Sequence, residues 1–223
     1  MTPREQLEHW HRAGRAVVHE ADAKDLLARI GVPVPVRDPA GGRCVAKLCH
    51  DAFPHKSDHG LVRLGLSPEA ARQAAADMAA RVPGGIPLIE AMEEDAVAEW
   101  IVGCKRDATF GPIVLAGPGG ILVELIDAAE IRLAPTDPRT AGAMLESGPG
   151  ARLLKGLRGG KPADRQALAE LISRVSVFFA RNADLISEIE INPVMVRADR
   201  GGLVAADALI VLAPAATAQE HDA

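Results

Sequence analysis

The strongest constraint on the fold is a pair of apolar segments near the C-terminal end, residues 185–197 and 203–212, which flank the turn-forming sequence ADRGG. Two such segments on either side of a Gly-containing turn predict an antiparallel β-hairpin. A turn centred on the DR of ADRGG fixes the register of the two strands. That register puts Asn192 opposite Asp207, with about 5 Å between their Cβ atoms.

The predicted hairpin has one apolar and one polar face. Strand alternation places Ile189 and Ile191 on the first face, and the second carries Glu188, Glu190 and Asn192. Carboxylate and amide oxygens are hard ligands that suit Mg²⁺. The alternative is a solvated outer face. Pro193, which fixes the backbone beside Asn192, and Asp207, which lies in an apolar run where a carboxylate needs a partner, favour the metal site.

Lys47 lies in the predicted strand CVAKLC, between two cysteines. A single lysine in a strand is commonly an edge or surface residue. The functional alternative is an ammonium group held over a phosphate, a role that lysine performs as a point charge.

A polar loop, residues 50–60, contains His50, His55 and His59 together with a lysine and two aspartates. The histidine spacing does not match a zinc motif, and no cysteine stands at a zinc-finger spacing, so zinc is disfavoured. A histidine beside a lysine suits contact with a phosphoryl group, in which the imidazole acts as nucleophile. The alternative is an exposed polar loop.

Two carboxylates flank a connection between predicted strands. Glu90 precedes the acidic turn EED and Glu99 follows it, and spacing alone favours surface positions for both. The later sequence GPGG matches neither a Walker loop nor a Rossmann fingerprint, and we interpret it as a turn.

The composition predicts a globular protein with a small ligand. Of the 223 residues, 48% are hydrophobic and 25% charged, enough for one large domain or two lobes that share a cleft. Aromatic residues make up 3%, and the formal net charge is −5, so we expect no nucleic-acid partner. No apolar run approaches about 18 residues, so we expect no membrane span. We also expect no signal peptide and, from three cysteines without a CxxC pair, a cytoplasmic location.

The order of expected elements mixes helices and strands. Helical spacing and capping residues predict helices over 20–30, 67–81, 138–145 and 163–180. Apolar runs predict strands before the hairpin over 44–49, 61–66, 86–92, 96–106, 113–117 and 121–126.

Five segments, in this order, resemble the nucleotide-binding part of the NDP-forming acyl-CoA synthetases, relatives of the succinyl-CoA synthetase β subunit. They are EADAKDLLARIGVPVP, VAKLCHDAFPHKSDHGLVRLGL, LIEAMEEDAVAEWIVGCKRDATFGPIVLAGPGGILVE, LLKGLRGGKPAD, and EIEINPVMV with AADALI. The resemblance implies an α+β protein of the ATP-grasp fold, in which two α+β lobes hold a nucleotide in the cleft between them. It divides the chain into an N-terminal extension (1–19), a trimmed small lobe (20–85), a larger lobe (86–213) and a tail (214–223).

The resemblance also implies a nucleotide site. Lys47 is similar to the family's phosphate-contacting lysine, and Glu99 to a carboxylate near the ribose. Glu90 falls on the strand that links the lobes, where the adenine is held. Asn192 and Asp207 resemble the Mg²⁺ ligands, in agreement with the predicted hairpin register.

Three further residues match family positions. Glu190 resembles the carboxylate that approaches a phosphohistidine. His55, in HKSD, resembles a histidine that shuttles the phosphoryl group in the acetyl-CoA-synthetase branch. Arg158, in GLRGG, matches a position that we assign to cofactor binding.

The implied activity is that of an ADP-forming acid–CoA ligase: carboxylate + CoA + ATP ⇌ acyl-CoA + ADP + phosphate, through an acyl phosphate and a phosphohistidine. ATP or ADP and Mg²⁺ are the expected cofactors. The chain shows no CoA-binding lobe, so we expect a heteromeric complex with a CoA-binding α-type subunit, through which a small carboxylic acid reaches the site.

Two departures from the family pattern keep alternatives open. The stretch between Val36 and Val45 is short, and His59 replaces a glycine that follows HKSD in the family. One alternative is therefore a non-catalytic ATP-grasp-like subunit with a regulatory or structural role. Another is an ATP-grasp ligase that joins a different carboxylate and nucleophile.

Overall fold

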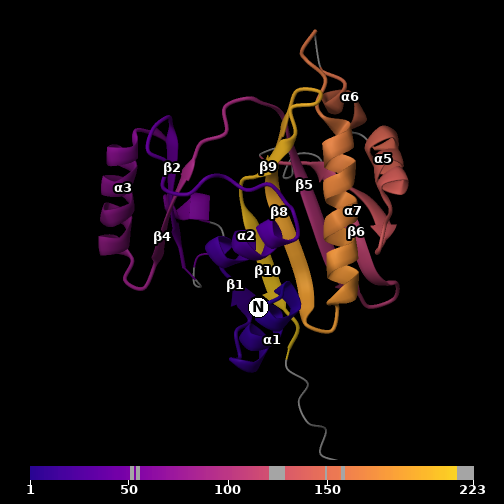
Figure 1. Cartoon of the computed structure of the whole chain (residues 1–223), viewed down its shortest axis with the longest axis horizontal. Helices are drawn as coiled ribbons and strands as arrows, with labels where there is room; N and C mark the ends of the chain where they lie inside the picture. The colour runs from indigo at the N-terminus through magenta and orange to yellow at the C-terminus, as the bar shows by residue number, and fades with distance from the viewer. Residues whose placement is uncertain (51–52, 54–55, 121–128, 149, 157–158, 215–223) are drawn as a thin grey trace, which may run out of the picture.

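The computed structural model describes residues 1–50, 53, 56–120, 129–148, 150–156 and 159–214, and these residues form two β-sheets with helices packed on them. In Figure 1 the three-stranded sheet and α3 (Pro68–Arg81) stand on the left. The seven-stranded sheet occupies the centre and right of the view, with α5 (Pro138–Ser147) and α7 (Arg165–Arg181) on the right. Helix α2 (Glu20–Arg29) is drawn between the two sheets.

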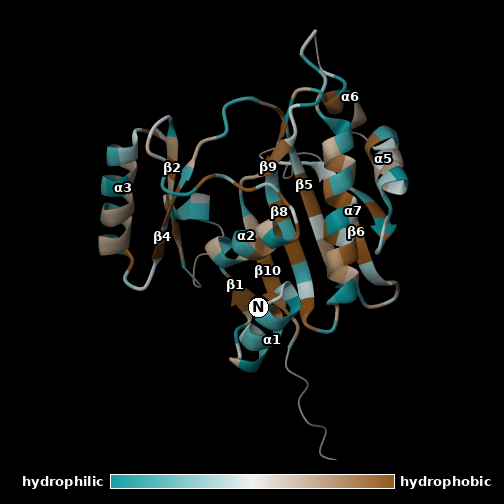
Figure 2. Cartoon of the chain, viewed as in Figure 1, coloured by the Kyte–Doolittle hydropathy of each residue, from teal (hydrophilic) through white to brown (hydrophobic). Residues whose placement is uncertain are grey.

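The larger sheet runs in the order β1-β10-β8-β5-β6-β7, with β9 paired to β8. Its strands are β1 Val17–Val18, β5 Ala96–Asp107, β6 Gly111–Pro118, β7 Glu130–Leu133, β8 Ile186–Arg197, β9 Leu203–Ala205 and β10 Ala208–Leu212. Two more helices accompany it, α1 Pro3–Arg12 and α6 Ala151–Leu154. Figure 2 shows hydrophobic residues along β8, β10 and α7, and the main core includes Ile189, Ile191 and Phe179.

The smaller sheet has the order β3-β2-β4 and its own hydrophobic core. Its strands are β2 Cys44–Cys49, β3 Val62–Leu66 and β4 Ile86–Ala91, and a short 3₁₀ helix, η1 Lys56–His59, precedes β3. Leu48 and Met78 are buried between this sheet and α3. The side chains on the opposite side of β2 are therefore left to face the rest of the molecule.

Local sequence signals determine where the helices begin and end. Ser67 caps α3 by accepting a hydrogen bond from the backbone N–H of Ala70 at 3.2 Å, and the Asp164 carboxylate caps α7 in the same way. Gly31 follows α2 with φ +84°, a conformation that favours glycine after a helix. These helices were predicted from the sequence, within a few residues at each end.

The C-terminal hairpin has the predicted register. Ile191 pairs with Ala208 and Val194 with Ala205, and the backbone N–H of Asn192 donates to the carbonyl oxygen of Asp207 at 3.2 Å. One detail differs. The expected single strand over 203–212 is interrupted at residues 206–207, so that it forms β9 and β10.

Some elements belong to a different sheet than the expected lobe boundaries, 20–85 and 86–213, would place them in. β4 pairs with β2 in the smaller sheet, although the expected boundary assigned residue 86 onward to the larger lobe. The buried side chains of α2, including Leu26 and Leu27, pack in the main core. Part of the expected extension 1–19 joins the larger sheet as β1, which pairs with β10.

Some expectations fall outside the described residues: the strand over 121–126 and nearly all of the tail 214–223. In the described ranges, no helix combines the length and apolar character needed to cross a bilayer.

Candidate functional site

Six charged side chains meet between the two sheets, and we call them the charged cluster: Glu20, Lys24, Lys47, Lys56, Glu90 and Asp207. They come from five places in the chain, namely α2, β2, η1, β4 and the break between β9 and β10. Three carboxylates and three ammonium groups make the cluster neutral as a whole. Charges that are removed from water need such pairing to be tolerated.

Lys47 is held at the centre of the charged cluster. Its Nζ lies 2.5 Å from Oε1 of Glu20 and 3.1 Å from Oε2 of Glu90. It also donates a hydrogen bond to the carbonyl oxygen of Ala206 at 2.6 Å. Burial disfavours the charged form, but the surrounding carboxylates outweigh it and raise the pKa of Lys47, so the ammonium group is charged at any physiological pH.

Glu20 contacts all three lysines of the charged cluster. Its Oε1 accepts from Lys24 at 2.7 Å as well as from Lys47, and its Oε2 lies 3.1 Å from Nζ of Lys56. Burial opposes ionisation of this carboxyl group, but Lys47, Lys24 and Lys56 together lower its pKa. Glu20 therefore stays ionised although its side chain is 1% exposed.

Asp207 lies where the polar face of the hairpin reaches the charged cluster. The two oxygens of its carboxylate lie 3.1 and 3.0 Å from Nζ of Lys56, and Oδ1 also accepts the backbone N–H of Ala208 at 2.8 Å. Asn192 is adjacent through its backbone bond to Asp207. The structure thus brings together the two residues that the sequence predicted as metal ligands.

Asn192 and Asp207 offer oxygen donors of the kind that Mg²⁺ prefers. Mg²⁺ takes few protein ligands and completes its octahedron with phosphate oxygens and water, so one carboxylate and one amide oxygen are a suitable set. In the described part of the chain, no group of three or more His, Cys, Asp or Glu side chains is arranged to hold a metal. The two donors Asn192 and Asp207 leave most of an octahedral shell to phosphate oxygens and water, which fits a metal that is bound together with a nucleotide.

Glu99 is linked to Asn192 through the end of β6. The backbone N–H of Gly120 donates to Oδ1 of Asn192 at 3.2 Å, and the N–H of Gly119 donates to the carbonyl oxygen of Glu99 at 2.9 Å. Gly120 has φ +61°, and a Cβ atom there would collide with the Glu99 carboxylate. The GPGG sequence, interpreted as a plain turn, thus positions two predicted site residues.

Glu90 and Glu190 differ in their surroundings. The Glu90 carboxylate is buried, with its oxygens 2.8 and 2.6 Å from Nζ of Lys24. Glu190 lies in the middle of β8, in register with Leu209 and Gly103 of the neighbouring strands, on the same partly exposed face as Asn192. Spacing alone had favoured a surface position for Glu90. This was wrong, because the Glu90 side chain of β4 is buried against Lys24 of α2.

Two predicted site residues, His55 and Arg158, lie outside the described residues. Their assignments stay predictions.

The sequence reasoning did not identify Glu20, Lys24 or Lys56 as members of the charged cluster. Glu20 and Lys24 stand four residues apart on a helix, which looks like an exposed surface pair. The available signal was the helix pattern itself: Lys24 lies next to Ala23 and one turn from Leu27 on the apolar stripe, where a charged side chain needs a buried partner.

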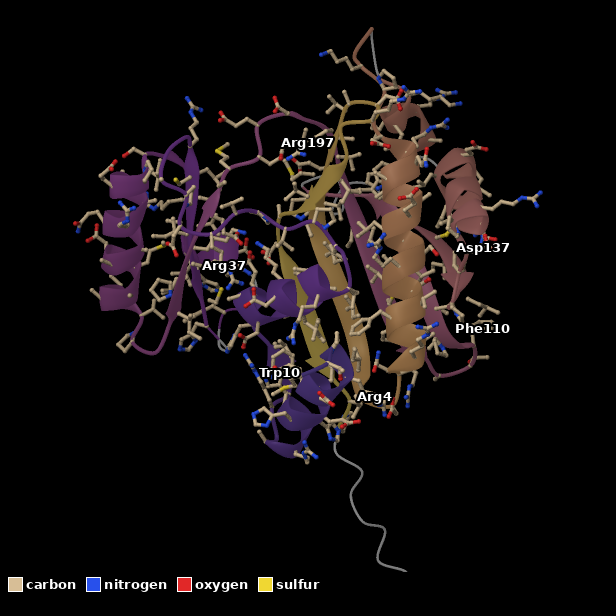
Figure 3. All side chains as sticks on the ribbon, in the orientation of Figure 1. Arg4, Trp10, Arg37, Phe110, Asp137 and Arg197 are labelled. Carbon is tan, nitrogen blue, oxygen red and sulfur yellow. The ribbon has the colours of Figure 1, made fainter. Side chains whose placement is uncertain are left out.

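Figure 3 shows Arg37 near α2, in the segment between α2 and β2. Its guanidinium donates to the Asp25 carboxylate at 3.1 Å and to the carbonyl oxygen of Ala21. These bonds tie the short connection between α2 and β2 to the helix that carries Glu20 and Lys24.

Comparisons with known proteins identify the family and the fold of the chain. A family profile described as an ATP-grasp domain matches residues 9–212. The β subunit of the Pyrococcus furiosus ADP-forming acetate–CoA ligase I is 32% identical, over 94% of this chain and 97% of that subunit. The Archaeoglobus fulgidus ADP-forming acetate–CoA ligase I is 35% identical, over 78% of this chain but 25% of that protein. The chain thus spans about a quarter of the longer relative and nearly all of the separate β subunit.

A solved structure gives the same result for the fold. The dinucleotide-forming acetyl-coenzyme A synthetase 1 of Candidatus Korarchaeum cryptofilum, with coenzyme A and Ca-AMPCP, has a TM-score of 0.85 and 29% identity, covering 95% of this chain and 100% of that chain. A complex of that protein with Mg-AMPPCP, whose phosphohistidine segment points towards the nucleotide-binding site, has a TM-score of 0.82. The α+β ATP-grasp fold predicted from the sequence is confirmed.

Proposed function

The chain belongs to the ATP-grasp domain family, with relatives among the β subunits of ADP-forming acetate–CoA ligases, and on that premise we propose that it is the nucleotide-binding β subunit of an ADP-forming acyl-CoA ligase. The reaction is carboxylate + CoA + ATP ⇌ acyl-CoA + ADP + phosphate, through an acyl phosphate and a phosphohistidine. A separate α-type subunit binds CoA and presents the small carboxylic acid. The relatives named as separate β subunits support this division.

One observation carries the proposal: the Lys47 ammonium group is bonded to the carbonyl of Ala206, the residue directly before Asp207. A phosphate-binding cation is therefore adjacent to a carboxylate suited to Mg²⁺. Phosphoryl transfer depends mainly on positioning and on neutralisation of the phosphate charge, and these groups provide both.

Each residue then has a defined task. Lys47 binds a phosphate group of the nucleotide, while Asn192 and Asp207 hold the Mg²⁺ that accompanies it. The bound Mg²⁺ neutralises phosphate charge and polarises the phosphoryl group. Glu99, exposed on β5 beside the Gly119–Gly120 segment, binds the ribose.

Because the Glu90 carboxylate is buried, it acts on the nucleotide site through its ion pair with Lys47. Glu190, on the same face of β8 as Asn192, receives the incoming phosphohistidine segment of the partner. Arg158 contributes to cofactor binding.

His55 shuttles the phosphoryl group, which is the role of the family histidine that it resembles. We expect the His55→Ala variant to bind Mg·ADP like the wild type but to block turnover by the reconstituted complex. Undiminished turnover would reduce His55 to an ordinary loop residue.

Calorimetric titration of the full chain with Mg·ADP tests the nucleotide site. We expect saturable binding that requires Mg²⁺ and that Lys47→Ala weakens at least about tenfold, as loss of a charge-assisted bond to phosphate should. Lys161→Ala, at an exposed lysine, is the matched control and should bind like the wild type. No binding at millimolar nucleotide, with or without a CoA-binding partner, would overturn the proposal and favour a non-catalytic subunit.

A further inference from the structure

Lys24 has no task in the proposed reaction, yet its side chain is fully buried and is among the largest that the described residues bury completely. Its Nζ contacts Glu20 and Glu90, at 2.6–2.8 Å. Because the side chain is buried behind these carboxylates, its ammonium group cannot reach a ligand itself. Any effect of Lys24 on the site must act through Glu20 and Glu90.

Lys24 shares its acceptor atoms with Lys47. Oε1 of Glu20 lies 2.7 Å from Nζ of Lys24 and 2.5 Å from Nζ of Lys47. Oε2 of Glu90 lies 2.6 Å from Nζ of Lys24 and 3.1 Å from that of Lys47. The two lysines therefore share the same two oxygen atoms and divide their negative charge.

Lys47 already has a full set of acceptors. An ammonium group has three N–H donors, and those of Lys47 face Glu20, Glu90 and the Ala206 carbonyl. A nucleotide phosphate must therefore replace one of these acceptors. The replacement becomes harder when the two carboxylates carry more unshared negative charge, because they then hold Lys47 more strongly and also repel the phosphate.

From this arrangement, and resting on the proposed nucleotide site, we propose that Lys24 is a positioning residue: it neutralises the carboxylates of Glu20 and Glu90 so that Lys47 can turn to a nucleotide phosphate. With Lys24 present, the four-residue group of two lysines and two carboxylates is neutral. Without Lys24, one negative charge remains unbalanced beside Lys47.

A purely structural salt bridge makes a different prediction. In that case, loss of Lys24 lowers thermal stability but leaves the nucleotide affinity of the folded protein unchanged. In that case, substituting Glu90 in addition to Lys24 would lower the thermal stability further and would not change the affinity. In the charge-balancing role, the same double substitution restores neutrality beside Lys47 and therefore restores binding.

The experiment compares Mg·ADP affinities of four full-length proteins by calorimetry: wild type, Lys24→Met, Lys24→Met/Glu90→Gln and the exposed control Lys161→Met. Circular dichroism establishes that each is folded. We expect Lys24→Met to bind at least about tenfold more weakly, the double variant within about threefold of wild type, and the control unchanged. Equal affinity of Lys24→Met and wild type overturns the positioning role, and so does a double variant as weak as Lys24→Met.

A variant that fails to fold does not block the test. If Lys24→Met is unfolded, Glu90→Gln replaces it, because it leaves excess positive charge beside Lys47. Charge balancing then predicts tighter binding than that of the wild type, and an affinity equal to or weaker than that of the wild type overturns it. A wild type that does not bind Mg·ADP refutes the proposed function and the role of Lys24 with it, whereas normal wild-type binding with unaltered variants refutes the role alone.

Discussion

The ammonium group of Lys56 lies across both carboxylate oxygens of Asp207, 3.1 Å from Oδ1 and 3.0 Å from Oδ2. These are the oxygens that we assign to Mg²⁺. An ammonium group and a divalent cation would repel each other on one carboxylate, so Lys56 would compete with a metal for these oxygens. Nζ of Lys56 also lies 3.1 Å from Oε2 of Glu20, and this second carboxylate helps to hold the lysine in place.

Replacing Lys56 should therefore strengthen the binding of Mg²⁺ in the absence of nucleotide. In the Lys56→Gln variant, Asp207 loses its competing cation and the charged cluster gains one net negative charge. We expect MgCl₂ to raise the melting temperature of this variant by a few degrees more than that of the wild type, roughly the effect of 1 kcal/mol.

The control for this measurement is Lys161→Gln, an exposed lysine far from the charged cluster in sequence, with NaCl at matched ionic strength to correct for screening. Equal Mg²⁺-induced shifts in all three proteins would show that Lys56 does not compete with the metal.

Asp207→Ala should remove the Mg²⁺ dependence of nucleotide binding while the fold stays intact. The metal would keep only the amide oxygen of Asn192 from the protein, too weak a donor set for a cation that favours carboxylates. We expect a loss of at least about tenfold in Mg·ADP affinity by calorimetry. Asp199→Ala, at the exposed hairpin turn, is the matched control. Wild-type affinity in Asp207→Ala would exclude this carboxylate as a metal ligand.

The pairing of Asn192 with Asp207 could be predicted because it is encoded locally. Period-2 alternation and a Gly-containing turn fix a hairpin register within about thirty residues of sequence. The break between β9 and β10 could not be predicted in the same way. Residues 206–207 make long-range contacts that no local pattern contains, such as the bonds from Lys47 to the carbonyl of Ala206 and from Lys56 to the carboxylate of Asp207.

The charged cluster was only half predictable for a related reason. Lys47 and Asp207 stood out because each interrupts an apolar run, whereas Glu20 resembles an ordinary acidic residue in the first turn of a helix. Its role depends on the packing of α2 into the main core and on β4 joining the smaller sheet, two long-range arrangements. Without them, no sequence pattern brings Glu20 to Lys47.

Gly119 should tolerate no side chain. A Cβ atom there would lie 2.5 Å from the carbonyl carbon of Trp100 and 2.7 Å from its oxygen, and these backbone atoms belong to the centre of β5. We expect Gly119→Ala to lower the free energy of unfolding by about 1–3 kcal/mol in urea titrations, because β6 must move away from β5. Gly142→Ala is the control, since its Cβ would meet open space on α5.

For the control, alanine in a helix should leave stability unchanged or raise it by up to about 1 kcal/mol. A Gly119→Ala protein as stable as Gly142→Ala would contradict the close approach of the two strands.

Glu93 and Arg197 should make the stability of the protein depend on pH. Arg197, labelled in Figure 3 at the end of β8, donates to Oε2 of Glu93 at 2.6 Å, and Glu93 lies in the connection from the smaller to the larger sheet. The hydrogen bonds from Arg197 lower the pKa of Glu93 against the opposing effect of burial. Since Arg197 is 37% exposed, solvent screening limits the pair to about 1 kcal/mol.

The direction of the pH effect follows from the lowered pKa. The folded protein binds the Glu93 proton less tightly than the unfolded chain, whose glutamate pKa is about 4.3. The stabilisation is therefore complete above that pH and disappears as the pH falls through the folded-state pKa. We expect Glu93→Gln to be less stable than the wild type in urea at about pH 7, with a difference that shrinks at acidic pH. Glu94→Gln, at an exposed position, should show little difference at either pH, and a Glu93→Gln difference that does not shrink in acid would rule out this ion pair as its source.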